Sequence, residues 1–385
     1  MKPIIGLDCQ KILSPTGSGA GVEHYVYHLA NQLAQNHDRF CDLCFCLHPR
    51  LQDSQVAKQL QAKTGVRTVF WPQSALERRG WWPYTKYRRQ ANFLRRQKLD
   101  LLHGPANVTP LFYQGKTVVT VHDLIIYEHP EWFPGGVADW FWRHSLVPQA
   151  LARADKIIAV SKFTKQQIIR HFRIDPEKIV VIYEGMTTAR VAPTASAPEK
   201  LPQRARQQKF LLYVGTVEPR KNLPRLIEAF GQISNFFPDL NLVIAGKMGW
   251  KYEPALRAAD QLTEKSRVIF TDYITQSQKE WLYQHALGFV YPSLAEGFGL
   301  PVLDAMANKI PVVTSNMSSL PEVAGSAAIF FDPYSVASIG MGMTKLVRDA
   351  DLRQKLITAG LDQARKFSWE QNIKQTLAVY QTVLN

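Results

Sequence analysis

The stretch Tyr291–Asp304, YPSLAEGFGLPVLD, holds the features that decide the fold. A short apolar run, Leu287–Pro292, predicts a buried strand, and a helix with a proline in its first turn is expected to begin near Leu300. Between them, Gly297 and Gly299 let a ligand approach the backbone, and the N–H groups of a helix start favour an anion. The sequence therefore predicts a strand–turn–helix unit with a diphosphate site at the turn.

Two carboxylates flank this turn. Glu296 stands just before the glycines, and Asp304 lies about a turn and a half into the expected helix. Because a carboxylate does not bind phosphate, we expect these acids to accept hydrogen bonds from hydroxyls of a sugar ring and a ribose. A diphosphate between two such rings is a nucleotide sugar. The alternative is a strand–turn–helix unit of any α/β protein with two surface acids, since glycine-rich turns alone are weak signals.

Apolar strands and amphipathic helices alternate along the chain, which predicts α/β domains with parallel sheets covered by helices. The 385 residues exceed one ordinary core, so two domains are expected. Between them lies a stretch rich in Ala, Pro, Thr and Arg without an apolar period. The expected divisions are a first domain over residues 1–186, a linker over 187–208 and a second domain over 209–368.

Thirteen strands are expected. Those of the first domain lie near Ile4–Asp8, Cys41–Leu47, Arg67–Phe70, Leu99–His103, Lys116–Val121, Lys156–Val160 and Ile179–Tyr183. Those of the second domain lie near Phe210–Val214, Asn241–Ala245, Val268–Phe270, Gly288–Tyr291, Pro311–Thr314 and Ala328–Phe331.

Polar residues follow several of these strands, at the carboxyl ends where ligands bind in such sheets. His122 and Asp123 follow one strand, and the alternative to a ligand contact is a buried structural pair. Arg220 and Lys221 precede a helix that Asn222 is expected to cap, and they would neutralise a departing diphosphate. For this pair the alternative is solvated loop charge.

Two further turns give weaker signals. Three glycines ending at Gly21 precede an amphipathic helix, and a flexible loop is the alternative to a ligand contact there. Ser315 opens another turn after a strand, in which Ser318 or Ser319 is equally consistent with a plain helix cap.

The string Tyr291–Asp304 closely resembles the donor-site motif of family 4 glycosyltransferases, a Glu followed after seven residues by a second Glu, with Asp304 in the second place. The segments TVHDLIIYEHPEWFP, from Thr120, and GTVEPRKNLPRLIEAF, from Gly215, resemble the same family. This resemblance implies an α/β GT-B architecture, two Rossmann-like domains with parallel sheets facing across a cleft. It also implies that a C-terminal helix over 369–385 joins the first domain, which takes the acceptor, while the second domain takes the donor.

The resemblance implies roles for individual residues. His122 would touch the transferred sugar, Lys221 matches the family's lysine, and Arg220 substitutes for an arginine that follows the glycine in many members. The implied catalytic residues are His122, Arg220, Lys221 and Glu296. The implied donor-binding residues are Gly21, Asp123, Gly297, Phe298, Gly299, Leu300, Asp304 and Ser315, with Gly21 in a loop that closes over the diphosphate.

The implied reaction is hexosyl transfer with retention, by front-face attack in which the leaving phosphate takes the acceptor proton. The wording of the motifs is most similar to bacterial mannosyltransferases that use GDP-mannose, and a UDP-sugar is the alternative donor. The expected acceptor is a saccharide, lipid-linked in many such systems, in cell-surface polysaccharide or glycolipid synthesis. No cofactor and no metal are expected, because the only Asp-x-Asp, Asp349–Asp351, lies in a helical region far from the glycine turns.

The net charge of +14 is concentrated in the first half, with +10 over residues 1–190 and +4 over 191–385. Within Glu77–Lys98, eight basic residues and one acid are interleaved with aromatic residues. This pattern fits an anionic membrane surface better than nucleic acid, which is not expected as a partner; a solvated helix face and a binding module on a decayed scaffold are the alternatives. The expected membrane-surface residues are Arg78, Arg79, Trp81, Trp82, Arg88, Arg89, Arg95 and Arg96.

The cysteines and the N-terminal sequence indicate location. Cys41, Cys44 and Cys46 fall in one apolar run and are expected to be core residues, although a metal site with His48 is conceivable. The apolar stretch before Asp8 is too short for a signal peptide, and no apolar run reaches the ~20 residues that span a bilayer. A cytoplasmic protein, or one held peripherally at the inner face of the cell membrane, is expected.

Overall fold

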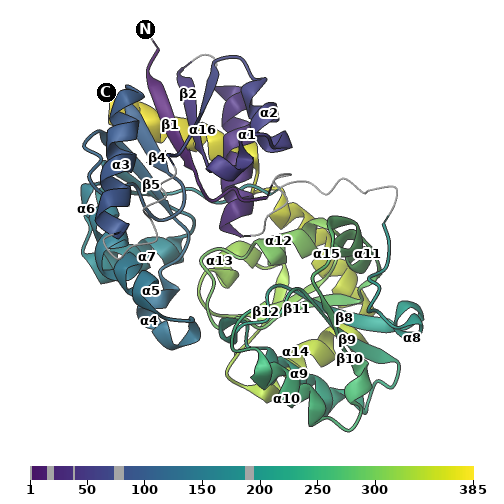
Figure 1. Cartoon of the computed structure of the whole chain (residues 1–385). Helices are drawn as coiled ribbons and strands as arrows, with labels where there is room; N and C mark the ends of the chain where they lie inside the picture. Colours follow the sequence, from purple (N-terminus) through teal and green to yellow (C-terminus); the bar gives the residue numbers. More distant parts are fainter. Residues whose placement is uncertain (1, 15–20, 38–39, 73–81, 187–194) are drawn as a thin grey trace. The chain divides into compact units, whose positions relative to one another are not determined.

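A computed structural model describes residues 2–14, 21–37, 40–72, 82–186 and 195–385, leaving out the side chains of residues 82–85. The chain divides into two compact units (Figure 1). Unit 1 comprises Met1–Tyr127, Gly135–Gly185 and Ser368–Asn385. Unit 2 comprises Glu128–Pro134 and Met186–Phe367.

Unit 1 contains a seven-stranded parallel sheet in the order β3-β2-β1-β4-β5-β6-β7. Its strands are β1 (Ile4–Cys9), β2 (Asp42–Leu47), β3 (Val66–Phe70), β4 (Leu101–Gly104), β5 (Lys116–Val121), β6 (Lys156–Ala159) and β7 (Ile179–Val181). Its longer helices are α1 (Val22–Asn36), α2 (Gln55–Gln61), α3 (Trp82–Arg96), α6 (Val147–Arg153), α7 (Lys162–Phe172) and α16 (Trp369–Leu384). Shorter elements are η1 (Pro49–Leu51), α4 (Ile125–Glu128), α5 (Val137–Phe141), the π-helical η4 (Trp142–Leu146) and η5 (Pro176–Lys178).

The last helix, α16, belongs to unit 1 although most of unit 2 precedes it in the chain. Its apolar side chains join the core cluster formed by β1, β2 and α1. Polar contacts fix its position: the hydroxyl of Tyr380 lies 2.6 Å from Nδ1 of the buried His103, and Asn372 donates to the Tyr183 carbonyl at 2.7 Å. The helix thus completes the core of unit 1.

Unit 2 contains a six-stranded parallel sheet in the order β10-β9-β8-β11-β12-β13. Its strands are β8 (Lys209–Val214), β9 (Leu240–Ala245), β10 (Val268–Asp272), β11 (Gly288–Tyr291), β12 (Val312–Ser315) and β13 (Ala328–Phe331). Its helices are α8 (Gln203–Gln207), α9 (Leu223–Ser234), α10 (Glu253–Asp260), α11 (Gln276–His285), α12 (Leu300–Ala307), α13 (Leu320–Ala324), α14 (Val336–Arg348) and α15 (Ala350–Ala364). Short 3₁₀ turns are η3 (Pro130–Trp132), η6 (Pro219–Lys221) and η7 (Lys265–Arg267).

Both sheets have a point at which the strand order reverses. It lies between β1 and β4 in unit 1 and between β8 and β11 in unit 2. In open parallel sheets the loops at the carboxyl ends of the strands separate at such a point and leave a crevice for a ligand. A ligand is therefore expected at the loops that follow these four strands.

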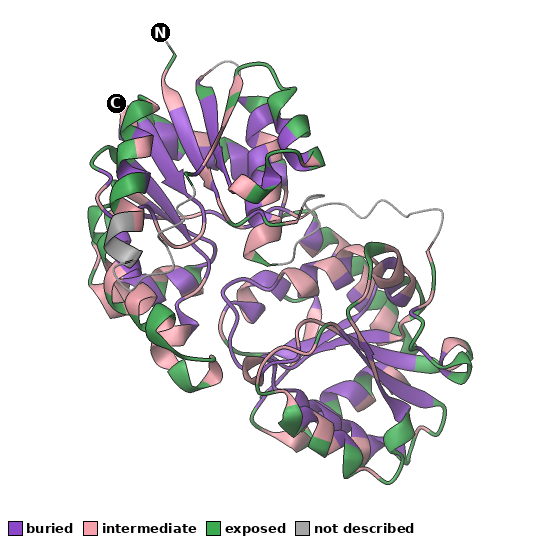
Figure 2. Cartoon of the chain, in the orientation of Figure 1, coloured by how far each residue is buried: buried purple, intermediate pink, exposed green. Residues whose placement is uncertain are grey.

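All thirteen expected strands are present, with ends that differ by at most two residues from the expected ones. The inner strands are mostly buried, whereas exposed residues lie mainly on the helices and loops (Figure 2), as expected for parallel sheets covered on both faces. Of the predicted linker, residues 203–207 form α8, and residues 187–194 lie outside the described ones. Among the helices of the described residues, none combines the length and apolar character that crossing a bilayer requires.

The cysteines lie in the interior of unit 1. Cys41, Cys44 and Cys46 are buried, and Cys46 packs with Trp71 and Leu94. In the part of the chain that the structure describes, no three His, Cys, Asp or Glu side chains gather as a metal-binding group would. Core packing therefore accounts for these cysteines.

Candidate active site

Two loops at the reversal point of unit 2 bring three of the predicted catalytic residues together. The loop after β8 forms the turn η6, which carries Arg220 and Lys221, and the loop after β11 carries Glu296. The two loops are hydrogen-bonded to each other through Leu294 N–H and the Arg220 carbonyl at 2.9 Å. The site is thus formed by chain segments 75 residues apart.

Glu296 is the centre of this cluster. Its Oε1 accepts from Lys221 Nζ at 2.5 Å, Ser293 Oγ at 2.6 Å and the Tyr291 hydroxyl at 3.0 Å. Its Oε2 accepts from Arg220 Nη1 at 2.7 Å. Burial alone would raise the pKa of Glu296, but the charges of Arg220 and Lys221, together with these hydrogen bonds, lower it to about 2. Glu296 is therefore a fully ionised, fixed carboxylate at neutral pH.

A second acid completes the cluster. Glu218 accepts from Arg220 Nε at 2.9 Å and Nη2 at 2.8 Å, and it is buried. Burial and the nearby Arg220 lower the pKa of Lys221, whereas Glu296 and Glu218 raise it. The negative charges of Glu218 and Glu296 thus balance the positive charges of Arg220 and Lys221. Glu218 was not among the predicted site residues, and its only signal in the sequence is its place two residues before Arg220.

Asn222 occupies the N-cap position of α9, as predicted, but its side chain does not cap the helix. It adopts a left-handed φ of 57°. Its Nδ2 donates to the carbonyls of Pro292 at 3.2 Å and Pro333 at 2.7 Å. The amide therefore ties the loop after β8 to the loops after β11 and β13, and so holds the neighbouring cations in place.

Two serines hold the glycine turn. Ser318 Oγ accepts from the Glu296 N–H at 2.9 Å. Ser319 Oγ lies 2.9 Å from the Glu296 carbonyl and 2.5 Å from the Phe298 carbonyl, so its hydroxyl donates to this pair. Ser319 also precedes α13 but makes no capping bond, so the plain-cap alternative is wrong for it. Ser315, the predicted donor contact, is buried, and its Oγ accepts from Met317 N–H at 3.1 Å.

The helix after the glycine turn begins where it was predicted. α12 starts at Leu300, and Gly299 before it has a φ of 123°, a conformation that favours glycine. The Phe298 ring is buried against Phe367, with ring centroids 5.7 Å apart, so any contact of Phe298 with a donor would involve its backbone. Diphosphate binding by Gly297, Gly299 and Leu300 stays a prediction.

Asp304 does not join the Glu296 cluster in this structure. Its Oδ2 accepts from Lys279 Nζ of α11 at 2.5 Å, in a pair whose side chains are about a quarter exposed. A ribose contact was predicted for Asp304, whereas its pairing with Lys279 was not. A ribose hydroxyl would have to share this carboxylate with Lys279.

In unit 1, His122 pairs with Glu184 rather than with its neighbour Asp123. Nδ1 lies 2.9 Å from Glu184 Oε1, and Nε2 lies 2.8 Å from the Pro105 carbonyl. Both ring nitrogens face acceptors, which a doubly protonated ring satisfies. Burial lowers the pKa of His122, but Glu184 and the Pro105 carbonyl outweigh it and raise the pKa overall. Asp123 accepts from the Ile125 N–H at 3.3 Å, at the start of α4.

The contacts of His122 bear on its predicted role. A histidine whose two nitrogens are engaged, and whose ring packs edge-on against Tyr25 at 4.7 Å between centroids, is held rigidly. Contact of His122 and Asp123 with the transferred sugar stays a prediction. Gly21 precedes α1 with a φ of 59°, which explains the glycine by backbone conformation, and residues 15–20 of its loop lie outside the described ones.

The predicted membrane surface is partly described. Arg78, Arg79 and Trp81 lie outside the described residues, and of Trp82 only the backbone, at the start of α3, is described. The remaining four residues of this surface are exposed on α3: Arg88, Arg89, Arg95 and Arg96.

Comparison with known proteins places the chain in a family. Residues 198–363 match the family described as Glycosyl transferases group 1, and residues 19–190 match Glycosyltransferase Family 4. O-antigen chain mannosyltransferase B of Escherichia coli is 33% identical over 299 residues, which cover 76% of this chain and 77% of that protein. Serotype-specific mannosyltransferase WbdA of Escherichia coli is 33% identical over 264 residues, or 66% of this chain and 32% of WbdA.

Among solved structures, sucrose-phosphate synthase from Thermosynechococcus elongatus has a TM-score of 0.73 over 99% of both chains, at 17% identity. The two Rossmann-like units and this likeness define the GT-B architecture. Together with the sequence matches, they show that the chain belongs to glycosyltransferase family 4.

Proposed function

We propose that this protein transfers mannose from GDP-mannose to a saccharide acceptor, with retention of anomeric configuration, in the synthesis of a cell-surface polysaccharide. The observation that supports this most is the cluster of Arg220, Lys221 and Glu296 at the reversal point of unit 2. Mannose as the transferred sugar, and polysaccharide as the product, are supported by the names of the two Escherichia coli relatives.

The cluster explains how such a transfer would proceed. Charge on the leaving diphosphate grows towards the transition state, and cations that are already fixed stabilise it without reorganisation. Lys221 and Arg220 are held by Glu296 and Glu218, so their positions are fixed by the protein itself. In front-face attack the leaving phosphate takes the acceptor proton, so the protein has to position the substrates and stabilise charge.

The donor is tested by measuring nucleotide release. The enzyme is incubated separately with GDP-mannose, UDP-glucose, UDP-galactose and ADP-glucose, each with a panel of mannosides as acceptors. We expect release of GDP from GDP-mannose that depends on the acceptor, and a product with an α-mannosidic bond by NMR. Consumption of a UDP-sugar instead would assign the alternative donor, and an inverted product would overturn the retaining mechanism.

We expect activity to survive EDTA. Arg220 and Lys221 supply the positive charge that a metal supplies in other transferases. Asp349, in the only Asp-x-Asp, caps α15 through Leu352 N–H at 2.8 Å, a structural task. The measurement is the initial rate of GDP release with and without EDTA. Loss of activity that Mg²⁺ or Mn²⁺ restores would contradict this expectation.

We also propose that α3 brings the enzyme to anionic membranes, with α5 as an apolar anchor. The segment Glu77–Lys98 carries an excess charge of +7. Tyr87 of α3 stacks on Phe141 of α5 at 6.2 Å between centroids, and α5 exposes 56% of Trp140 and 86% of Val137. A basic helix beside exposed apolar side chains matches a membrane interface, where each Lys or Arg contributes about 1 kcal/mol.

The test is co-sedimentation with vesicles at physiological salt. We expect pelleting with vesicles containing phosphatidylglycerol and loss of pelleting when four arginines of α3 are changed to glutamine: Arg88, Arg89, Arg95 and Arg96. The matched control neutralises four exposed basic residues of unit 2: Lys209, Lys265, Arg365 and Lys366. Equal loss in both variants, or tight binding to duplex DNA without pelleting, would contradict a membrane role for α3.

A further inference from the structure

The reversal point of unit 1 carries a polar cluster that no proposed step uses. Asp8 lies near the carboxyl end of β1, the strand that adjoins β4 where the strand order reverses. Its Oδ1 accepts from the Gln10 N–H at 3.0 Å and from Trp71 Nε1 at 3.2 Å. The same topological rule that locates the cluster of unit 2 thus points to this carboxylate.

Two amide side chains extend the cluster. Gln10 Nε2 donates to Asp8 Oδ2 at 3.3 Å, and Gln90 Nε2 of α3 donates to Gln10 Oε1 at 3.3 Å. Gln90 is only 5% exposed, and within the described part of the chain its Oε1 has no hydrogen-bond partner. A buried amide oxygen without a partner is unfavourable, so the site is short of a donor.

Asp8 Oδ2 can also accept a further hydrogen bond. Its one hydrogen bond from a described residue, that from Gln10, is long, and a carboxylate oxygen can accept more than one. Asp8 is nevertheless only partly covered, so a ligand can reach it. Burial raises the pKa of Asp8 to about 6 against the opposing hydrogen bonds from Gln10 and Trp71 and the charge of Lys11. The cluster therefore contains one oxygen without a donor, Gln90 Oε1, and a second, Asp8 Oδ2, that can accept a further hydrogen bond.

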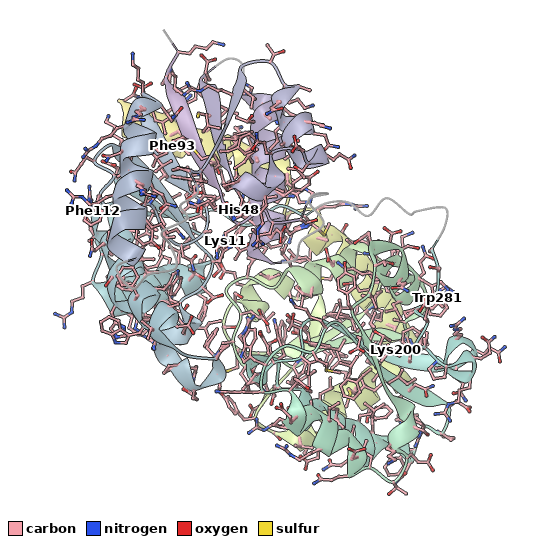
Figure 3. All side chains as sticks on the ribbon, in the orientation of Figure 1. Lys11, His48, Phe93, Phe112, Lys200 and Trp281 are labelled. Carbon is pink, nitrogen blue, oxygen red and sulfur yellow. The ribbon has the colours of Figure 1, made fainter. Side chains whose placement is uncertain are left out.

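The groups around the cluster are polar and suit a sugar. Tyr87 of α3 is half-buried, and burial, with a smaller contribution from the charge of Asp8, raises its pKa to about 12. Lys11 and His48, labelled in Figure 3, follow β1 and β2 at the same edge of the sheet. A carboxylate, two amides and a phenol are groups that bind vicinal hydroxyls.

We infer that Asp8, Gln10 and Gln90 form a binding subsite for a saccharide, in which sugar hydroxyls donate to Asp8 Oδ2 and Gln90 Oε1. This inference rests on the proposed function, because it identifies the saccharide with the acceptor. A ligand hydroxyl that donates to a carboxylate makes a charge-assisted hydrogen bond, so loss of the charge should weaken binding about tenfold or more.

The test uses the full chain and does not depend on turnover. Saturation-transfer NMR with methyl α-D-mannopyranoside, and with the corresponding glucoside and galactoside, measures saccharide binding directly. Asp8→Asn keeps the shape and removes the charge. Asp42→Asn is the matched control, because Asp42 is exposed at the opposite end of the neighbouring strand β2. We expect transfer in the parent and in Asp42→Asn, and about tenfold weaker binding in Asp8→Asn.

Kinetics separate this inference from the proposed function. Asp8→Asn and Gln90→Leu should raise the KM for the acceptor about tenfold while the KM for GDP-mannose and the melting temperature stay close to those of the parent. If the parent consumes GDP-mannose and Asp8→Asn has the same KM for the acceptor as the parent, the subsite is wrong and the proposed function stands. If the parent consumes no GDP-mannose but binds a glycoside more tightly than Asp8→Asn does, the proposed donor is wrong and the subsite stands. Absence of transfer from all three glycosides in the parent would overturn the subsite.

Discussion

Lys221→Ala is expected to lower kcat by about 10²-fold and to change donor affinity far less. Lys221 Nζ is buried, donating to Glu296 at 2.5 Å and to the Tyr291 hydroxyl at 2.7 Å. Its charge acts most strongly when the diphosphate leaves, because negative charge on the leaving group is greatest then. The measurements are kcat from initial rates of GDP release and the Kd for GDP-mannose by calorimetry.

Removing a buried cation also leaves Glu296 with one fewer partner, so stability has to be measured separately. Lys221→Met keeps most of the side-chain volume, and its kcat should be as low as that of Lys221→Ala. Lys265→Ala removes an exposed lysine that lies 3.8 Å from Asp260, and it should keep the parent's rate. A Lys221→Met enzyme that folds and turns over like the parent would show that this cation does not assist the leaving group.

Glu296→Gln is expected to reduce kcat/KM more than Asp304→Ala does. The glutamine keeps the size of the side chain but removes the charge that Arg220 and Lys221 pair with. A hydrogen bond to an ionised acceptor contributes ~1.5–3 kcal/mol against about 1 kcal/mol for a neutral pair. Asp304 is already bound to Lys279, and its proposed contact is with the ribose, remote from the reacting bond. Equal losses in kcat/KM would remove the reason for giving the two acids different roles.

Acid unfolding gives an independent measure of Glu296. Its pKa falls from an ordinary 4.5 to about 2 in the folded protein, so the ionised form stabilises the fold. This contribution is complete above pH 4.5 and is lost as the pH falls towards 2. The difference in melting temperature between parent and Glu296→Gln should therefore shrink over that interval. A difference that stays constant would show that the stability loss has another cause.

The sheets could be predicted because of where their strands lie. A parallel strand covered on both faces is a continuous apolar run, as in β11 (Gly288–Tyr291) and β5 (Lys116–Val121), and such runs stand out in a sequence. The turns after them could be identified by glycine and proline. Arg220, Lys221 and Glu296 were predicted to serve one site, and the structure brings them into contact.

Partners that depend on the folded chain could not be predicted. The pair of Asp304 with Lys279 joins two helices 25 residues apart, and the pair of His122 with Glu184 spans 62 residues. Periodicity reports which face of an element is buried, but it does not report which charged side chain lies opposite another. Glu218 was not predicted for the same reason, because an acidic residue in a loop shows no sequence pattern that indicates which cation lies beside it.

The position of α16 has a consequence for the order in which the protein is made. Its residues Trp369, Ile373 and Tyr380 fill the core of unit 1 beside β1, yet they leave the ribosome after residues 186–367 of unit 2. Because domains fold as units while the chain is synthesised, unit 2 can reach its native state first. The core of unit 1 therefore stays incomplete until α16 has been synthesised. Chaperones that recognise nascent apolar surface would therefore act on the first half of this protein for longer than on the second.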